Sequence, residues 1–365
     1  MNKIKNIIIT AVFVLIIGGF SIFHIILPDG EVSEWERRKL QQLPEASLST
    51  LFDGYFMNSF ETYLTDQFPL RDTFRTLKAS FHFNVLGQKD NNDIVVIDGY
   101  ASKLDRKING VSVKNFTQKI TKIYDTYLKD TDCRTYFSLV PDKNTFLTEG
   151  TDYPHFEYEE LYDLTVQGLP YNLKKIEIKS LLDDWRYYKT DSHWRQDEIV
   201  PVANKIREKL GIAPLGELTM NDAGDFYGVY YGQSALPLEA DRLIYLSNDE
   251  IDCATVTNIE NDSITKVYDL SKLEALDRYD IFLSGALSII EIDNPMGAED
   301  KELIIFRDSF GSSLAPLLIP GYSKVTLIDT RYIPTNMIKQ FVSFDKQDVL
   351  FIYGTGIVNN SSSLR

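Results

Sequence analysis

Histidine is scarce in this 365-residue sequence, which contains only four of them. Because histidine is the side chain that titrates near neutral pH, there are few candidates for a general base. His24 lies in an apolar run, His82 in an aromatic helical segment, and His155 in a polar, acidic loop. His193 is therefore the histidine that remains as a candidate base.

Cysteine and positive charge are also in short supply. Cys133 and Cys253 could pair outside the cell, but two buried free thiols are the simpler expectation, and their number and spacing indicate neither a metal site nor a disulfide framework. The net charge of -15 disfavours nucleic acid as a partner. The chain has no phosphate-cradling loop, and no second histidine lies near the acidic pair Asp183 and Asp184. No cofactor and no metal are expected.

The N-terminus carries a long apolar run, residues 7–27, which is long enough to cross the roughly 30 Å hydrocarbon core of a bilayer. Lys3 and Lys5 precede it, and the positive-inside tendency then places the rest of the chain outside. A cleaved signal peptide is the alternative, although the run is long for one and no small-x-small site follows. We expect residues 1–27 to be a cytoplasmic tip and a single transmembrane anchor in the cell membrane, with the main domain extracytoplasmic.

The remainder divides into a helical juxtamembrane region, residues 28–90, and an α/β domain, residues 91–365. Ser33 and Glu36 have the spacing of a helix capping box. Beyond residue 90, apolar strand-like runs alternate with helical periodicity, which predicts a mostly parallel sheet flanked by helices. Residues 212–298 are rich in turn signals and are expected to form an insertion that decorates the sheet. The predicted strands are 93–98, 135–140, 302–306, 324–329 and 348–353, and the predicted helices are 111–129, 197–210 and 312–318.

Two short motifs could carry chemistry. Asp191 stands two residues before His193, and on an extended segment these side chains project to the same side, so the carboxylate can orient the ring. Ser309 follows the apolar run 302–306 at a sharp turn before a helix, a position that raises a serine above the carboxyl edge of a sheet. The amides of that turn could also receive an oxyanion. An exposed loop with a chance Asp-x-His, and a serine that only caps a helix, are the alternatives.

Taken together, residues 187–194 (YYKTDSHW) and 306–311 (FRDSFG) resemble the DHHW family of SGNH-hydrolase-like proteins and its relatives in alginate and exopolysaccharide O-acetylation. The resemblance extends over most of residues 30–355. It implies an SGNH-like, flavodoxin-like α/β fold and a catalytic triad of Asp191, His193 and Ser309. Ser192 stands where the family name has histidine, and the usual Gly-x-Asn-Asp oxyanion block is absent from the sequence. Further matching segments are Glu36, Arg37 and Leu40, then 52–54 (FDG), 66–71 (DQFPLR), 140–143 (VPDK), 226–228 (FYG), 328–332 (IDTRY) and 348–353 (DVLFIY).

The resemblance also implies substrate or oxyanion contacts at Arg331 and Tyr332, although Arg331 could equally brace the sheet through an ion pair. Trp194 is expected to wall off the Asp-His pair, and Tyr227, in an aromatic and glycine-rich stretch, could line a sugar groove.

The expected function is serine acyl transfer outside the membrane, as an O-acetyltransferase or acetylesterase acting on cell-wall polysaccharide or exopolysaccharide. The expected partners are the carbohydrate polymer, an acetyl donor and, by resemblance, a membrane-bound O-acyltransferase. A non-catalytic polysaccharide-binding or assembly protein that retains the fold is the alternative.

Overall fold

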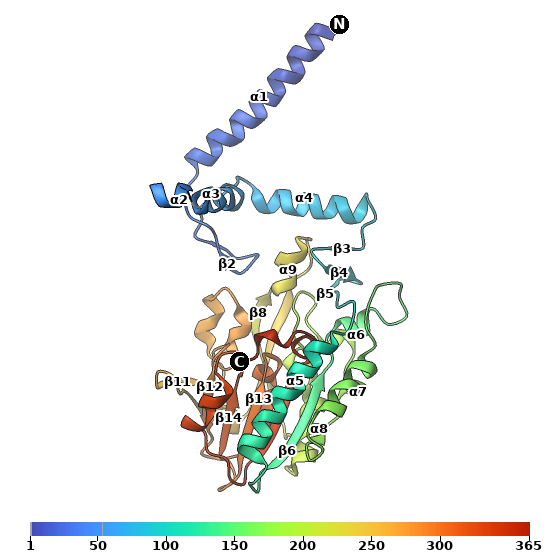
Figure 1. Cartoon of the computed structure of the whole chain (residues 1–365), viewed down its shortest axis with the longest axis vertical. Helices are drawn as coiled ribbons and strands as arrows, with labels where there is room; N and C mark the ends of the chain where they lie inside the picture. Colours follow the sequence, from blue (N-terminus) through green and yellow to red (C-terminus); the bar gives the residue numbers. More distant parts are fainter. Residues whose placement is uncertain (1, 53) are drawn as a thin grey trace. The chain divides into compact units, whose positions relative to one another are not determined.

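The computed structural model describes residues 2–52 and 54–365 and contains two compact units (Figure 1). The N-terminal unit combines Met1–Asn92 with a short distant segment, Tyr231–Pro237. The sheet unit contains Asp93–Tyr230 and Leu238–Arg365. Each unit is described by itself below.

The sheet unit is built on a mixed sheet with the strand order β11-β10-β12-β14-β13-β15-β6-β7. Strands β14, β13, β15, β6 and β7 pair in parallel, and β12, β10 and β11 extend the sheet by antiparallel pairing. The predicted mixed α/β class with a large sheet is confirmed. In chain order the strands are β6 (Arg134–Val140), β7 (Lys174–Lys175), β10 (Thr255–Asn258), β11 (Ser263–Lys266), β12 (Ile289–Asp293), β13 (Glu302–Arg307), β14 (Lys324–Ile328) and β15 (Asp348–Gly354).

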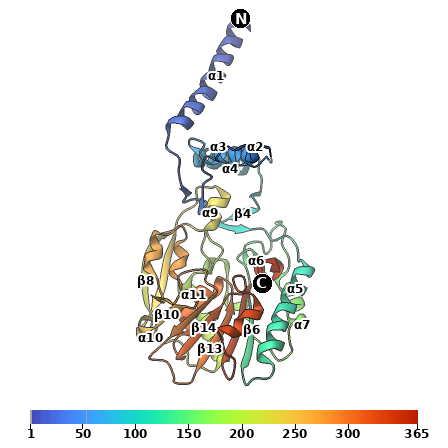
Figure 2. The ribbon, with the colours of Figure 1, turned by 60° about the vertical axis from the view of Figure 1, so that its left-hand side comes forward.

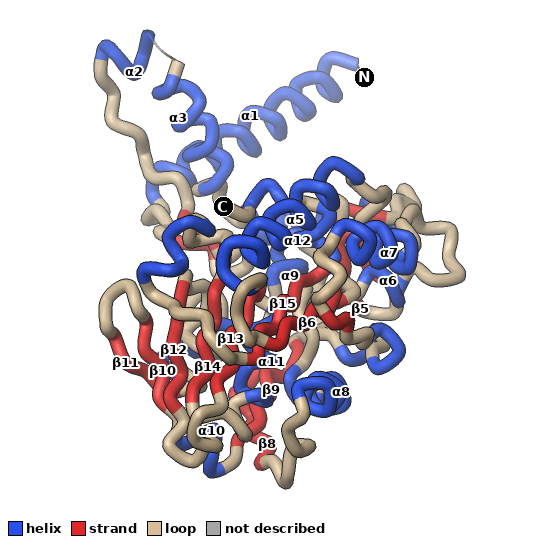
Figure 3. Tube along the Cα trace, turned by 60° about the horizontal axis from the view of Figure 1, so that its bottom comes forward, coloured by secondary structure: helices blue, strands red, loops and turns tan. Residues whose placement is uncertain are grey.

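Helices cover both faces of this sheet (Figure 3). Along β13, Leu303 and Ile305 point into one apolar cluster with α8 and α11, whereas Ile304 and Phe306 point into another with α5 and α7. Burial on both faces explains why the central strands read as unbroken apolar runs. The helices of the unit are α5 (Gly110–Ile123), α6 (Asn144–Leu147), α7 (Tyr158–Gly168), α8 (Val200–Leu210), α10 (Asp249–Cys253), α11 (Phe310–Leu318) and α12 (Thr355–Asn359).

Two hairpins lie outside the large sheet. Strand β4 (Ile94–Ile97) pairs antiparallel with β5 (Tyr100–Lys103), and β8 (Thr219–Phe226) pairs antiparallel with β9 (Asp241–Ser247). Helix α9 (Val229–Ser234) follows β8.

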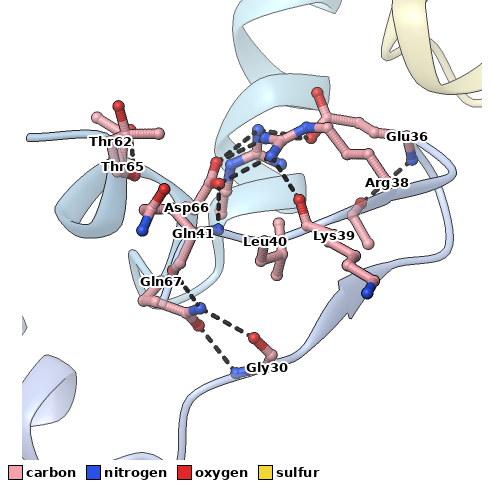
Figure 4. A network of polar contacts seen from close by, with 12 residues as sticks. Gly30, Glu36, Arg38, Lys39, Leu40, Gln41, Thr62, Thr65, Asp66 and Gln67 are labelled. Carbon is pink, nitrogen blue, oxygen red and sulfur yellow. Dashed lines mark hydrogen bonds and ion pairs between the residues drawn. The ribbon is translucent and has the colours of Figure 1, made fainter. Parts of the chain in front are cut away.

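The N-terminal unit consists of helices α1 (Asn2–Ile26), α2 (Leu48–Phe52), α3 (Tyr55–Asp66) and α4 (Arg71–Asn84), with strands β1 (Val32–Ser33), β2 (Arg38–Lys39) and β3 (Asp90–Asn91) (Figure 2). A polar network joins its parts (Figure 4). Arg38 binds Asp66 through two hydrogen bonds of 2.8 and 2.6 Å, and the Gln67 side chain bonds both the N–H and the carbonyl of Gly30 at 2.9 Å. Among the described residues, α1 is the helix with the length and composition to cross a membrane.

Three expectations need correction. Ser33 Oγ does accept a hydrogen bond from the Glu36 N–H, at 3.1 Å, but the bond closes a turn between β1 and β2 and no helix begins there. Residues 212–298 are not only an insertion, because β10, β11 and β12 belong to the main sheet itself. Cys133 and Cys253 are unpaired as expected, although both are half-buried and not buried.

Candidate functional site

Asp191 and His193 lie in a tight hairpin of the sheet unit. Tyr187 and Trp194 form an antiparallel bridge at its base, and the Tyr188 N–H donates to the His193 carbonyl at 3.1 Å. The intervening residues make a short loop, and the two predicted side chains project from it on the same side. The sequence analysis expected an extended Asp-x-His, but residues 189–193 form bends, and the two side chains meet because the loop turns back on itself.

The carboxylate of Asp191 orients the imidazole of His193. Asp191 Oδ1 lies 2.6 Å from His193 Nδ1 and also accepts the His193 backbone N–H at 3.0 Å. This contact assigns the proton to Nδ1, which leaves Nε2 as the acceptor, the arrangement that a general base requires. Asp191 is almost fully buried, whereas His193 keeps partial exposure.

A segment distant along the chain, Gly228 and Val229, also contacts Asp191. Its Oδ2 accepts the Val229 N–H at 2.9 Å. Gly228 passes so close that a Cβ there would lie 2.2 Å from the Asp191 Cβ, so only glycine fits without displacement. Thr190 fixes the same crossing, because its Oγ1 accepts the Gly228 N–H at 2.8 Å and donates to the buried Asp241 at 2.6 Å.

The side chain of Lys143 binds the backbone of the Asp191 hairpin. Its Nζ donates to the carbonyls of Tyr188, Lys189 and Asp191 at 2.6, 3.2 and 2.8 Å, and the side chain is almost completely buried. Burial lowers the pKa of Lys143 to about 7, against the opposing attraction of Asp241 and Asp191. Lysine is needed because its ammonium group offers three donors to three carbonyls.

Ser309 stands at the turn between β13 and α11. It occupies the N-cap position of α11, yet its side chain makes no capping hydrogen bond. Asp308 Oδ1 accepts the Phe310 N–H at 3.0 Å instead, and the Asp308 carbonyl accepts the Gly311 N–H at 3.1 Å. A purely capping role for Ser309 is thus disfavoured, and these two amides, expected as oxyanion donors, are already occupied.

A cavity of about 320 Å³ opens beside Ser309. Its lining includes Ser192 together with three carboxyl side chains, Asp105, Asp142 and Asp308. Burial raises the pKa of all three, that of Asp142 to about 6. The lining also includes Lys103, so the cavity combines carboxyl groups that burial shifts toward the neutral form with a basic side chain.

Tyr279 packs between the two motifs. Its ring stacks on His193 with centroids 3.9 Å apart and planes 8° from parallel, and its hydroxyl lies 3.4 Å from the Ser309 carbonyl oxygen. Phe310 meets the same imidazole edge-on at 5.5 Å. Within residues 2–52 and 54–365, the hydrogen bonds include none between Ser309 Oγ and His193. The fold therefore brings the two motifs together through Phe310 and Tyr279, without a hydrogen bond between Ser309 and His193 in this part of the chain.

The other predicted site residues have mixed outcomes. Trp194 is buried and donates through Nε1 to Ser313 Oγ at 2.9 Å, so it packs behind the Asp-His pair. Arg331 is ion-paired with the buried Asp329 at 2.6 Å, which is the bracing role, while Tyr332 and Tyr227 are exposed.

Part of the aromatic and glycine-rich stretch around Tyr227 belongs to the hydrophobic core. Phe226 is fully buried and packs edge-on against Tyr188, with ring centroids 4.9 Å apart. The sequence predicts no role for Lys143, Gly228 or Tyr279. Lys143 and Gly228 do lie in segments that resemble the DHHW family, 140–143 and 226–228. Lys143 acts on backbone carbonyls, which leave no trace in a sequence.

Known structures share this fold. A DHHW family protein from Eubacterium siraeum superposes with a TM-score of 0.60 at 19% identity, over 75% of this chain and 95% of that one. Bacillus cereus PatB1, solved with a sulfonyl adduct, gives 0.58 at 17% identity over 73% and 95%. The O-acetyltransferase domain of Pseudomonas putida AlgJ is more distant, with a TM-score of 0.45 at 10% identity over 73% and 92%.

At the level of sequence, no curated protein matches the chain. The family model described as DHHW protein matches residues 169–328, a range that contains the Asp191 hairpin and the Ser309 turn. The resemblance to the DHHW family predicted from the sequence is thus confirmed, by the family model over that range and by the fold.

Proposed function

We propose that this chain is an extracytoplasmic serine acyl-transfer enzyme, an O-acetyltransferase or acetylesterase acting on a cell-wall polysaccharide or exopolysaccharide. The observation that carries the proposal is the buried Asp191 carboxylate 2.6 Å from His193 Nδ1, beside a serine that its own helix does not use. A buried carboxylate held on Nδ1 of a histidine is the acid-base half of a serine triad.

In the proposed reaction His193 Nε2 removes the proton of Ser309 Oγ as the oxygen attacks the acetyl carbonyl of the donor. The tetrahedral intermediate collapses, the donor's oxygen leaves with the proton that His193 returns, and an acetyl-serine remains. A sugar hydroxyl, or water, then attacks this ester while His193 takes its proton; the bond between the acetyl carbon and Ser309 Oγ breaks, and His193 returns the proton to Oγ. Transferase and esterase differ only in that final acceptor.

The cavity beside Ser309 supports a neutral acceptor. Sugar hydroxyls can donate hydrogen bonds to the carboxyl groups of Asp105 and Asp142 and can accept from Lys103. Helix α1 supports the location, because a membrane anchor would keep the enzyme beside a membrane-bound source of acetyl groups, the expected O-acyltransferase partner.

The test is acetyl-ester hydrolysis by the full chain in detergent, compared with Ser309→Ala and with Ser263→Ala, an exposed serine on β11. Removing the nucleophile should lower kcat by at least about 10³-fold, while the Ser263 variant should match the unsubstituted protein. Phenylmethanesulfonyl fluoride should label the unsubstituted protein once, and mass spectrometry should place the label on Ser309. Hydrolysis that survives Ser309→Ala would exclude the proposed nucleophile.

A second candidate is a polysaccharide-binding or assembly protein that retains the fold. It is favoured by the missing hydrogen bond between Ser309 and His193 in the described part of the chain. In the catalytic candidate, this hydrogen bond forms when substrate binds, as catalytic hydrogen bonds often do. Polysaccharide binding without ester hydrolysis and without sulfonyl labelling would decide for the second candidate.

A further inference from the structure

Helix α4 of the N-terminal unit carries a stripe of apolar side chains that stay largely exposed. Leu70, Phe74, Leu77, Phe81 and Val85 recur every three or four residues and so form one stripe along the helix. Their exposed fractions are 66%, 41%, 64%, 49% and 65%. A surface helix of a globular protein buries such a stripe, so the amphipathic orientation of α4 is inverted.

Contacts on the opposite side of α4 fix the rotation of the helix about its own axis. Ala79 is completely buried there. Arg71 pairs with Glu36 at 2.6 Å, and Arg75 pairs with Glu36 at 3.1 Å and donates to the Gly232 carbonyl at 2.7 Å. The charged side of the helix is thus fixed inward by specific contacts, which leaves the apolar stripe outside.

The stripe is continuous with apolar surface on α1. Phe20 of α1 stacks on Phe68 with centroids 5.3 Å apart and meets Phe74 edge-on at 5.6 Å. An apolar groove of about 1030 Å³ runs between α1, α3 and α4, with Ile16 and Phe60 in its walls. The helix with the composition of a membrane span and the exposed stripe therefore belong to one apolar surface.

We propose that α4 lies in the membrane interface, with the stripe from Leu70 to Val85 inserted among lipid acyl chains. A helix with one face of aromatic and aliphatic side chains and a charged opposite face can lie in the plane of a bilayer at the level of the headgroups. The exposed Lys78, next to Leu77, borders the stripe and can reach lipid phosphates. The inference does not depend on the catalytic proposal. It gives the chain a second, in-plane attachment beyond α1.

The experiment uses the full chain reconstituted into phosphatidylethanolamine and phosphatidylglycerol vesicles. Cys133 and Cys253 are replaced by alanine, and single nitroxide-labelled cysteines are placed at Leu77 or Phe81, both exposed and therefore tolerant of substitution. A label at Leu15 reports on α1 separately, and a label at the exposed Ser263 on β11 provides the aqueous reference. Collision rates with oxygen, which concentrates in lipid, and with a water-soluble nickel chelate are compared by electron paramagnetic resonance.

We expect the ratio of oxygen to nickel collisions at Leu77 and Phe81 to exceed the ratio at Ser263 several-fold. Leu77 and Phe81 labels that match Ser263 would overturn the proposal, whatever the Leu15 label reports. Labels shielded from both reagents would also overturn it, because the stripe would then be covered by protein, either a second copy or another part of the chain. Failure of the anchor and failure of the α4 proposal are thus distinguishable.

Discussion

Lys143 is the residue on which the shape of the Asp191 hairpin depends most directly. Replacing it in Lys143→Met preserves the volume but leaves the buried carbonyls of Tyr188 and Asp191 without this donor, at about 1 to 3 kcal/mol for each, whereas the Lys189 carbonyl keeps the Ala101 N–H. We expect a lower free energy of unfolding and a loss of ester hydrolysis well beyond what partial unfolding explains. Lys209→Met, at an exposed position on α8, serves as the matched control.

The lowered pKa of Lys143 predicts that the free energy of unfolding depends on pH. Because burial lowers its folded pKa to about 7, below the value of about 10.4 in an unfolded chain, the unfolded state binds more protons between these values. Lys143 therefore makes the free energy of unfolding rise with pH from about 7 to 10, and Lys143→Met should remove that rise. Urea titrations at pH 6, 8 and 9.5 measure it, and parallel curves for the two proteins would contradict the lowered pKa.

The Asp191–His193 pair could be predicted from the sequence, whereas Lys143, Gly228 and Tyr279 could not, because their contacts join segments that are distant along the chain. The pairing of Asp191 with His193 follows from their spacing alone. Lys143 contacts only carbonyl oxygens in the hairpin, and Gly228 is required because Asp191 approaches its Cα, a crossing between segments 38 residues apart. Neither contact has a local signature.

At the scale of elements, the loop after β14 depends on one ion pair. Asp329 is fully buried, and Arg331 binds it through Nε and Nη2 at 2.9 and 2.6 Å, whereas Arg307 is more distant at 3.5 Å. Arg331→Ala should lower the free energy of unfolding by about 3 kcal/mol, because it leaves a buried carboxylate short of a partner. Denaturant unfolding measures this loss, and Arg331→Lys should retain part of the stability. A raised KM with unchanged stability would instead indicate a substrate contact.

The elements that could be predicted are those buried on both faces. β13, β14 and β15 appear as short, nearly continuous apolar runs because helices cover both sides of the sheet. β10 and β12 lie toward one end of the sheet, and their mixed polar sequences were interpreted as decoration. Ser33 to Glu36 shows the opposite error, since a capping hydrogen bond forms there without a helix.

At the scale of the whole molecule, the N-terminal unit is assembled from two separate pieces of chain. The Gly232 carbonyl accepts from Arg75, and the carbonyls of Ser234 and Gln233 accept from Asn91 and Asn92, at 2.7, 2.9 and 3.0 Å. A protein that begins at Asp93 would lack all three donor residues, Arg75, Asn91 and Asn92. One that begins at Pro28 would keep them.

We therefore expect the protein beginning at Asp93 to unfold at a lower temperature than the protein beginning at Pro28, although both lack α1. Limited proteolysis should cut the shorter protein first between residues 231 and 237, where the backbone has lost its partners. Equal melting temperatures and equal protease resistance would show that the second piece holds its structure without the first.

The crossing from one unit to the other has a mechanical consequence for the site. The Val229 N–H holds Asp191, Tyr230 ends the sheet unit, and Tyr231 begins the second piece of the N-terminal unit. Tension applied to the N-terminal unit thus reaches the amide that positions Asp191 through two residues of backbone. A force on the N-terminal unit and the orientation of the His193 imidazole are thus linked through the backbone of residues 229–231 and the hydrogen bond from Val229 to Asp191.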